Sequence, residues 1–184
     1  MSEHGNEPTP ADIIAFWREV GPERWFKKND GIDAEIRHRY LARHEEAAEG
    51  WLSPWALNAE GTLALLILLD QFPRNMFRGD KRAFATDEKA RSIASRGILN
   101  GFDSAFEDMR TFFYLPFMHS EDLADQEKAI AFYRAYNNDD GVKWAEMHAD
   151  IIRRFGRFPH RNAVLGRTTT LDEQTFLDSG GFAG

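Results

Sequence analysis

The chain has 184 residues, a net charge of −7 and no cysteine. A chain of this length forms a core without disulfides, and the lack of cysteine excludes thiol nucleophiles and cysteine zinc sites. With 23 Lys and Arg against 30 Asp and Glu, a nucleic-acid partner is not expected, because such binding neutralises phosphates. The longest apolar run, Leu63–Leu69, is far shorter than the roughly 20 residues that span a bilayer. Since the polar N-terminus also lacks a signal-peptide pattern, we predict a cytoplasmic protein without a membrane partner.

The composition favours helices, because 22 Ala and 14 Leu stand against three Val, and β-branched residues are the ones that favour strands. Helical spacing of apolar residues and the position of turn residues set the expected boundaries. The stretch 58–71 is apolar on every face, which is typical of a central helix. In chain order, the predicted helices cover residues 10–20, about 31–49, about 58–71, 87 to near 100, part of 102–117, 120–136, about 141–155 and a short stretch after Thr170.

Capping residues support several of these starts. Thr9, followed by a proline, is expected to cap the first helix, and Thr86 the fourth. Ser120 is expected to begin a later helix, with acidic residues at its positive end. Thr170 and Glu173 have the spacing of a capping box. The apolar stripe of the second helix is expected to extend to Trp51.

Short connections between these helices predict antiparallel helical hairpins packed in layers. The fold class is therefore all-α, although the stretch 111–115 is the one place where a strand could replace a helix. No low-complexity linker divides the chain, so we expect a single helical domain over 1–184. Residues 1–9 and 180–184 are expected to be flexible ends.

Two segments have similar sequences: FPRNMFRG at 72–79 and FPHRNAVLG at 158–166. Each follows an apolar helix and combines Phe-Pro, Arg-Asn, an apolar residue and Gly. Because proline ends helices and Asn and Gly accept left-handed backbone, both segments could be helix-end caps of two similar hairpins. The alternative is that their arginines and amides build a binding site.

The charge distribution supports the alternative. No acidic residue lies between Asp150 and Asp172, a stretch that is rich in arginine. An acidic protein that gathers guanidinium groups in two matching loops could bind a carboxylate or phosphate. Equally, those arginines could pair with carboxylates such as Glu121 or Asp125. The candidate ligand-binding residues are Arg74, Asn75, Arg157, His160, Arg161, Asn162 and Arg167.

Candidate proton-transfer groups are His119, His148, Asp70 and Glu121, because a carboxylate–imidazole pair performs general acid–base chemistry. His148 lies on an apolar stripe, which is more typical of a core histidine that bonds a neighbour. Asp70 could equally form an ion pair with an arginine of the second segment. No metal-binding pattern, phosphate loop or dinucleotide motif is present, so neither a metal nor a cofactor is predicted.

The strings LLDQFPRN at 68–75, YLPFMHSED at 114–122 and RFGRFPHRN at 154–162 resemble a bacterial family known as domain of unknown function 924. RWF at 24–26 and LGR at 165–167 fit the same pattern, so the resemblance covers nearly the whole chain. It implies an all-helical fold similar to tetratricopeptide-repeat proteins and supplies no activity. No tetratricopeptide consensus recurs at its characteristic period of about 34 residues.

Three hypotheses follow. The favoured one is a small-ligand protein, enzymatic or not, with an Arg- and His-lined pocket for an anionic ligand. The second is a tetratricopeptide-like module that binds a protein or peptide without catalysis. The third is that the two similar segments serve packing alone. The sequence does not indicate the oligomeric state.

Overall fold

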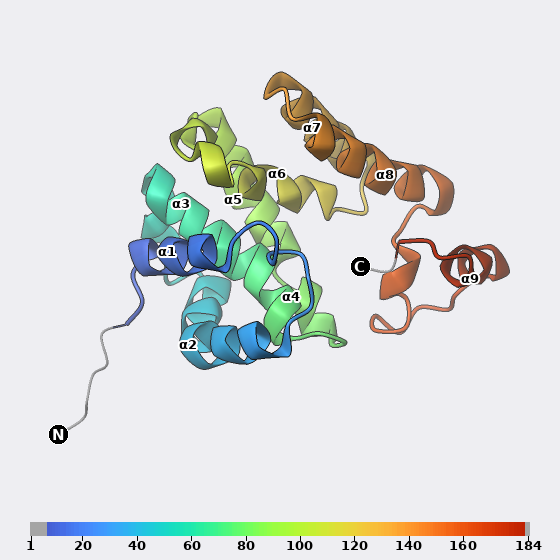
Figure 1. Ribbon diagram of the computed structural model, residues 1–184, viewed down its shortest axis with the longest axis horizontal. Coiled ribbons are helices and arrows are strands. Elements are labelled where there is room, and N and C mark those ends of the chain that lie inside the picture. The colour runs from blue at the N-terminus through green and yellow to red at the C-terminus, as the bar shows by residue number, and fades with distance from the viewer. Residues whose placement is uncertain (1–6, 183–184) are drawn as a thin grey trace. The chain divides into compact units, whose positions relative to one another are not determined.

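The computed structural model describes residues 7–182, and every regular element in that range is helical (Figure 1). This confirms the predicted all-α class, and the stretch considered as a strand is part of helix α6. No helix within 7–182 is long and apolar enough to cross a bilayer. The α-helices are α1 (Pro10–Val20), α2 (Asp30–Glu49), α3 (Ala59–Leu66), α4 (Phe72–Met76), α5 (Asp87–Leu99), α6 (Thr111–Met118), α7 (Leu123–Ala135), α8 (Asp139–Phe155) and α9 (Leu171–Asp178).

The chain divides into two compact units. The first comprises Met1–Arg78 and Arg82–Pro116, and the second comprises Gly79–Lys81 and Phe117–Gly184. The single domain over 1–184 stays a prediction. The expected flexible ends lie outside the described residues at 1–6 and 183–184. Of the remainder, Glu7 forms an ion pair with Arg43, 2.7 Å away.

Helix α3 is the centre of the first unit. Every side chain from Leu63 to Leu69 is buried, as the uniformly apolar sequence predicts. Helices α1 and α5 pack against α3, and so does the 3₁₀ turn η1 (Ser53–Leu57). Gly61 permits the approach of η1, because a Cβ at this position would lie 2.1 Å from the carbonyl oxygen of Trp55.

The sequence predicted that the central helix ends before Pro73, but the helical path continues through this residue. A π-helical turn, η2 (Ile67–Gln71), connects α3 directly to α4, so that Pro73 lies inside a continuous helical path. In an α-helix a proline removes the bond to the carbonyl four residues earlier, and a π turn displaces the neighbouring bonds. Side chains replace the lost donors: His44 Nδ1 bonds Leu68 O at 2.9 Å, and Thr86 Oγ1 donates to Leu69 O at 2.6 Å.

The predicted helix starts are confirmed where a capping side chain is present. Thr9 accepts a bond from the N–H of Asp12, and Thr170 from that of Glu173, each in a complete capping box. At the start of α5, Thr86 occupies the N-cap position but makes no capping bond with its side chain. Helix α7 begins later than predicted, because its N-cap is Asp122.

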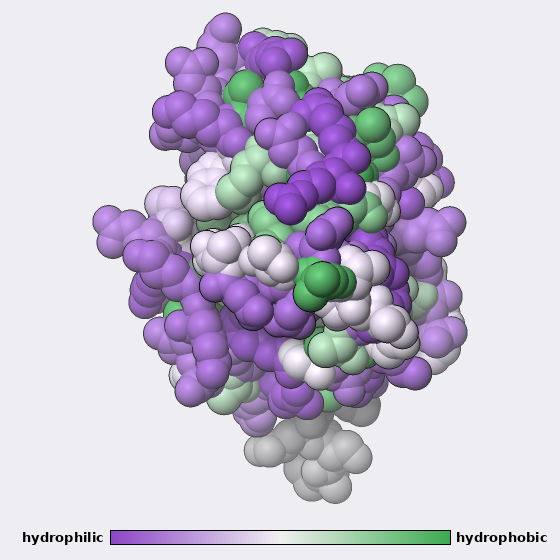
Figure 2. All heavy atoms as spheres, turned by 90° about the vertical axis from the view of Figure 1, so that its right-hand side faces the viewer, coloured by the Kyte–Doolittle hydropathy of each residue, from purple (hydrophilic) through white to green (hydrophobic). Residues whose placement is uncertain are grey.

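In the second unit, α7 and α8 pack side by side (Figure 1). Gly141 in α8 lies against the ring of Tyr133, where a Cβ would be 2.2 Å from Cδ1. Beyond α8, the 3₁₀ turn η6 (Pro159–Arg161) and α9 complete the unit. Its described core includes Ile151, Ile152 and Phe158, with Phe155, Phe176 and Phe182 packed against them. The face displayed in Figure 2 is mainly hydrophilic, with small scattered apolar areas.

One predicted core residue lies at the surface instead. Trp51 follows the C-cap Gly50 of α2 and is 74% exposed. The left-handed backbone of Gly50, with φ of 90°, turns the chain away before the helical stripe reaches Trp51. The prediction from regular helical spacing therefore made the apolar face of α2 too long.

Candidate functional site

The first of the two similar segments is committed to packing within its unit. Arg74 donates two bonds of 3.0 Å to Asp87, one to each carboxylate oxygen, and a further bond of 2.5 Å to Asp70 O. It also lies 3.5 Å from the carboxylate of Asp70, which is 1% exposed. Asp70 thus forms an ion pair with Arg74, an arginine of the first segment one helical turn later in the chain. Its pairing with an arginine of the second segment stays a prediction.

The neighbouring polar residues have internal partners as well. Asn75 Nδ2 donates to Asp33 Oδ1 at 2.7 Å, and Arg78 donates to both oxygens of the same carboxylate at 2.6 and 3.1 Å. These bonds join α2 to α4 and to the segment that follows it. In the first unit, the arginines and the amide of the repeated sequence thus favour the packing hypothesis.

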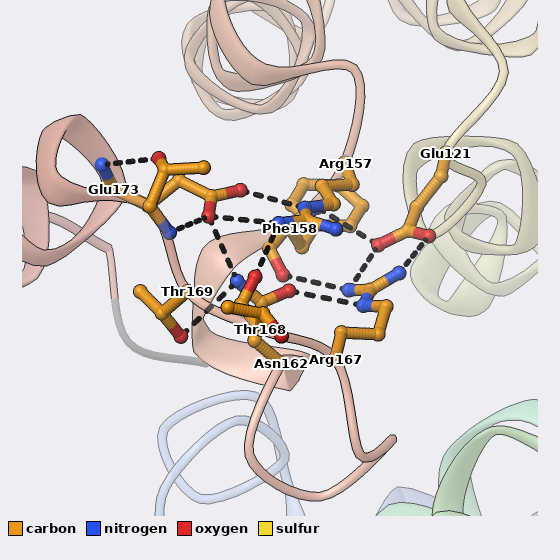
Figure 3. A network of polar contacts seen from close by, with 9 residues as sticks. Glu121, Arg157, Phe158, Asn162, Arg167, Thr168, Thr169 and Glu173 are labelled. Atoms are coloured by element: carbon orange, nitrogen blue, oxygen red, sulfur yellow. Dashed lines mark hydrogen bonds and ion pairs between the residues drawn. The ribbon is translucent and has the colours of Figure 1, made fainter.

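At the second segment, a carboxylate from before helix α7, Glu121, accepts three hydrogen bonds. Arg167 donates to both oxygens of Glu121, at 2.7 and 3.0 Å, and the N–H of Phe158 donates to one of them at 2.8 Å (Figure 3). Burial opposes ionisation, but the Arg167 guanidinium and the Phe158 N–H lower the pKa of Glu121 below its usual value. Glu121 is therefore a fixed anion and a poor proton donor near neutral pH.

A second carboxylate, Glu173, is bound in the same manner. Arg157 donates to its two oxygens at 2.6 and 2.9 Å, Asn162 Nδ2 donates at 3.1 Å, and the N–H of Thr170 at 2.8 Å (Figure 3). The Arg157 bond is the main cause that lowers the pKa of Glu173 to about 2. Asn162 joins the two ion pairs, because its Oδ1 accepts a bond from Arg167 at 2.9 Å.

Two imidazoles and a guanidinium lie around the buried ring of Phe158, and a third imidazole, His119, acts electrostatically on one of them. The ring centroids of His148 and His160 lie 5.7 and 5.6 Å from that of Phe158, and the guanidinium of Arg161 lies 4.6 Å from it. His119 and Arg161 both act electrostatically on His148. We define these four residues, His119, His148, His160 and Arg161, as the imidazole cluster.

The bonding of His148 fixes its chemistry. The ring is buried, and Nδ1 lies 2.8 Å from the carbonyl oxygen of Trp144. Because a carbonyl only accepts, Nδ1 carries the proton, which leaves the Nε2 lone pair of the neutral ring unprotonated. Burial is the main cause that lowers the pKa of His148 to about 4; the charges of His119 and Arg161 act in the same direction, and the bond to Trp144 opposes them. His148 is thus a neutral acceptor and only a weak base at neutral pH.

The predicted site residues therefore separate into two sets. The second unit brings together those of the second segment with His119, His148 and Glu121, whereas Asp70, Arg74 and Asn75 belong to the first unit. The prediction of His148 as a core histidine bonded to a neighbour is confirmed. Within residues 7–182, no group of three or more His, Asp or Glu side chains has a geometry that could hold a metal ion.

Sequence reasoning missed a surface pocket in the first unit. Its volume is about 420 Å³, and it lies between the end of α2, η1, α3 and α5. Lys89 and Arg96 of α5 line it, together with Ser53, Leu65 and others. Because these residues come from four elements and form no motif, no local pattern in the sequence indicates the pocket.

The chain is similar to a known protein family and to a solved structure. The model of a family described as bacterial protein of unknown function (DUF924) matches residues 13–181. The chain belongs to the DUF924 family. The solved structure of the protein of unknown function ATU0120 from Agrobacterium tumefaciens is 46% identical in sequence to this chain, with a TM-score of 0.90. That match covers 93% of this chain and 97% of the other. No curated protein matches the chain.

Proposed function

We propose that this DUF924 protein binds a small anionic ligand, in the cytoplasm, at the imidazole cluster of its second unit. The observation that carries the proposal is the gathering of Arg161, His148 and His160 around Phe158, with His119 acting electrostatically on His148. The guanidinium of Arg161 is the kind of donor that suits a carboxylate or a phosphate.

The charges of the surrounding network support this assignment. Arg167 donates to both carboxylate oxygens of Glu121. Arg157 donates to both carboxylate oxygens of Glu173. Arg161 acts electrostatically on Glu121 as well. The guanidinium groups of Arg157, Arg161 and Arg167 thus belong to one network, and groups of this kind bind carboxylates and phosphates.

The same geometry favours binding over proton transfer. A histidine that acts as a general base at neutral pH needs a pKa near the working pH, and burial lowers that of His148 to about 4. The carboxylate of Glu121 is held ionised by Arg167 and Phe158. The proposal therefore assigns neither His148 nor Glu121 a proton-transfer role and includes no reaction step.

Thermal unfolding in the presence of inorganic phosphate, pyrophosphate or citrate tests the proposal. A ligand present at 100 times its dissociation constant stabilises a protein by about 2.7 kcal/mol, which is a shift of several degrees for a domain of this size. We expect such a shift in the natural protein and its loss in Arg161→Gln. The matched control is Arg134→Gln, because Arg134 forms an ion pair with Glu146 on α8, away from the cluster.

A second readout does not depend on whether Arg161→Gln folds. In the natural protein, phosphate should shift the NMR signals of His119 and His160 in a saturable manner. The proposal is wrong if no anion of the panel stabilises the protein beyond sodium chloride of equal ionic strength and no imidazole signal moves.

The surface pocket of the first unit supports a second candidate function, a tetratricopeptide-like module that binds a peptide. Arg96 is exposed at the pocket wall and forms no ion pair within residues 7–182. Trp51 and Leu57, at the two ends of the η1 region, are 74% and 80% exposed. An acidic peptide with an apolar side chain fits these groups. Binding of such a peptide that Arg96→Glu abolishes, with no anion effect on the imidazole cluster, would favour this second function.

A further inference from the structure

The surface pocket of the first unit has an apolar interior. Among the residues that line it, the buried ones are Ala47, Leu65 and Ile93, whereas the lining residues of η1 and the polar ones of α5 are more exposed. Its volume of about 420 Å³ is within the range of small-molecule sites. A ligand with an apolar part would therefore gain free energy by covering these three buried side chains.

Two polar side chains of the pocket wall are committed to the end of α2. Lys89 Nζ donates to Ala47 O and Ala48 O, and Ser53 Oγ donates to Gly50 O at 2.5 Å. Carbonyl groups at the C-terminus of a helix carry partial negative charge, which balances the ammonium group. Lys89 and Ser53 thus hold α5 and η1 against α2, and the other charged groups of the wall decide which ligand fits.

Those other charged groups are Glu88 and Arg96. Both are exposed, and neither side chain has a hydrogen bond or an ion pair within residues 7–182. They lie eight residues apart on α5 with Ser92 midway, so the three residues share one face of the helix. Eight residues rise about 12 Å along a helix. The wall therefore carries a negative and a positive charge that are well separated along the pocket.

We propose that this pocket binds a small zwitterion in which an apolar chain separates a carboxylate from an ammonium group. The guanidinium of Arg96 donates to the carboxylate, Glu88 pairs with the ammonium group, and the chain covers Leu65 and Ile93. Both an ω-amino carboxylate and a short apolar peptide with free ends carry this chemistry.

This site is independent of the imidazole cluster, because every residue that lines the pocket belongs to the first unit. It also gives the pocket a different occupant from the acidic peptide of the second candidate function. An acidic peptide would place like charges beside Glu88, whereas the ammonium group of a zwitterion is attracted to it.

The test measures the binding of 8-aminooctanoate to the natural protein by isothermal titration calorimetry. Octanoate lacks the ammonium group, octylamine lacks the carboxylate, and 4-aminobutanoate has both charges on a shorter chain. We expect 8-aminooctanoate to bind about 2- to 5-fold more tightly than octanoate or octylamine, the equivalent of one exposed ion pair. The binding of 4-aminobutanoate should be weaker by about 10-fold at least, because each buried methylene group accounts for about a 4-fold gain.

Replacing the two charges should give a pattern that a purely structural role would not produce. Glu88→Gln should weaken the binding of 8-aminooctanoate about 2- to 5-fold without weakening that of octanoate. Arg96→Gln should weaken the binding of both without weakening that of octylamine. Glu60→Gln and Lys27→Gln are the controls, because both residues are exposed and neither lines the pocket.

NMR of the natural protein locates the ligand. Saturation with 8-aminooctanoate should shift the methyl signals of Leu65 and Ile93 and leave that of Ile151, in the second unit, unchanged. The inference is wrong if the Leu65 and Ile93 signals do not move. It is also wrong if octanoate binds the natural protein as tightly as 8-aminooctanoate, because Glu88 would then have no part in binding.

The outcomes separate this inference from the proposed functions. Binding of an acidic peptide that Glu88→Gln strengthens, without binding of 8-aminooctanoate, would overturn the inference and favour the second candidate function. The effect of phosphate on His119 and His160 tests the imidazole cluster alone. The tripeptide Ala-Ala-Ala, compared with its N-acetylated amide, distinguishes a peptide source from an ω-amino carboxylate. If neither zwitterion binds, the inference fails.

Discussion

The hydroxyl of Thr86 donates to the carbonyl oxygen of Leu69 at 2.6 Å, where the central helical path approaches Pro73, which has no N–H. Leu69 lies four residues before Pro73, so its carbonyl would have no partner in a regular helix. Both residues are buried, and a buried carbonyl without a donor is costly. A side chain from the start of α5 thus compensates for a proline inside the central helix.

Thr86→Val should therefore lower the free energy of unfolding by about 1–3 kcal/mol, because the shape is kept and the donor is lost. The same change should cost less in a Pro73→Ala background, where residue 73 regains an N–H that can reach Leu69 O. Urea unfolding of the four proteins in a double-mutant cycle measures this coupling. Additive effects would contradict the compensation.

The sequence predicted the helices but not the hydrogen-bond partners of their polar side chains. Apolar periodicity correctly indicated the central position of α3, and two capping boxes were correct because their bonds are local. Thr86 was predicted as a cap since its position allowed that, yet its bond goes to a carbonyl 17 residues earlier. Long-range partners of this kind depend on how helices pack, which no local pattern encodes.

The same limit explains the mixed outcome for the repeated sequence. Both segments share Phe-Pro and Arg-Asn, but Pro73 lies inside a helix, whereas Pro159 begins a 3₁₀ turn after the C-cap Gly156. The absence of carboxylates between Asp150 and Asp172 predicted an anion site, which stays a proposal. The charge distribution did not reveal that two carboxylates from outside this stretch neutralise arginines at its ends. Glu121 binds Arg167, and Glu173 binds Arg157.

Gly61→Ala should destabilise the protein by about 3 kcal/mol, because the new Cβ would lie 2.1 Å from the backbone oxygen of Trp55. Gly31→Ala is a matched control. Both glycines lie in the first turn of a helix and donate their N–H to an Asn N-cap, but the nearest atom to a Cβ at Gly31 is 3.3 Å away. Its effect should be within about 1 kcal/mol, the range of helix propensity. Equal effects in chemical denaturation would refute close packing of η1 on α3.

Asn162→Asp should destabilise the second unit by about 2–3 kcal/mol at neutral pH. The new carboxylate could still accept from Arg167, but it would lose the donor to Glu173 and place a like charge beside it. The control is Asn100→Asp, since Asn100 is exposed and bonds only a local carbonyl, Arg96 O. Urea unfolding should show a large loss for the first variant and a small one for the second. A similar loss in both would mean that Asn162 does not link the two ion pairs.

The stability of the second unit should fall in acid as Glu173 is protonated. Its pKa is lowered from 4.5 to about 2 by Arg157. A carboxylate with a lowered folded-state pKa binds protons more readily when unfolded, so its contribution is complete above about pH 5 and disappears as the pH falls towards 2. Glu173→Gln should be less stable at pH 7 and should flatten this decline. Thermal unfolding between pH 2 and pH 7 measures both curves, and parallel curves would contradict the assignment.

His148 should titrate far below an ordinary histidine, because burial lowers its pKa from 6.5 to about 4. The unfolded chain then binds the proton more readily between these values, so stability declines as the pH falls from about 6.5 to about 4. NMR titration of the imidazole signals should show one ring with a pKa near 4 that is absent from His148→Gln. Phe182→Ala should raise this pKa towards 6.5, since the ring that covers His148 at 4.6 Å is removed. An unchanged pKa in Phe182→Ala would show that Phe182 does not shield the imidazole from water.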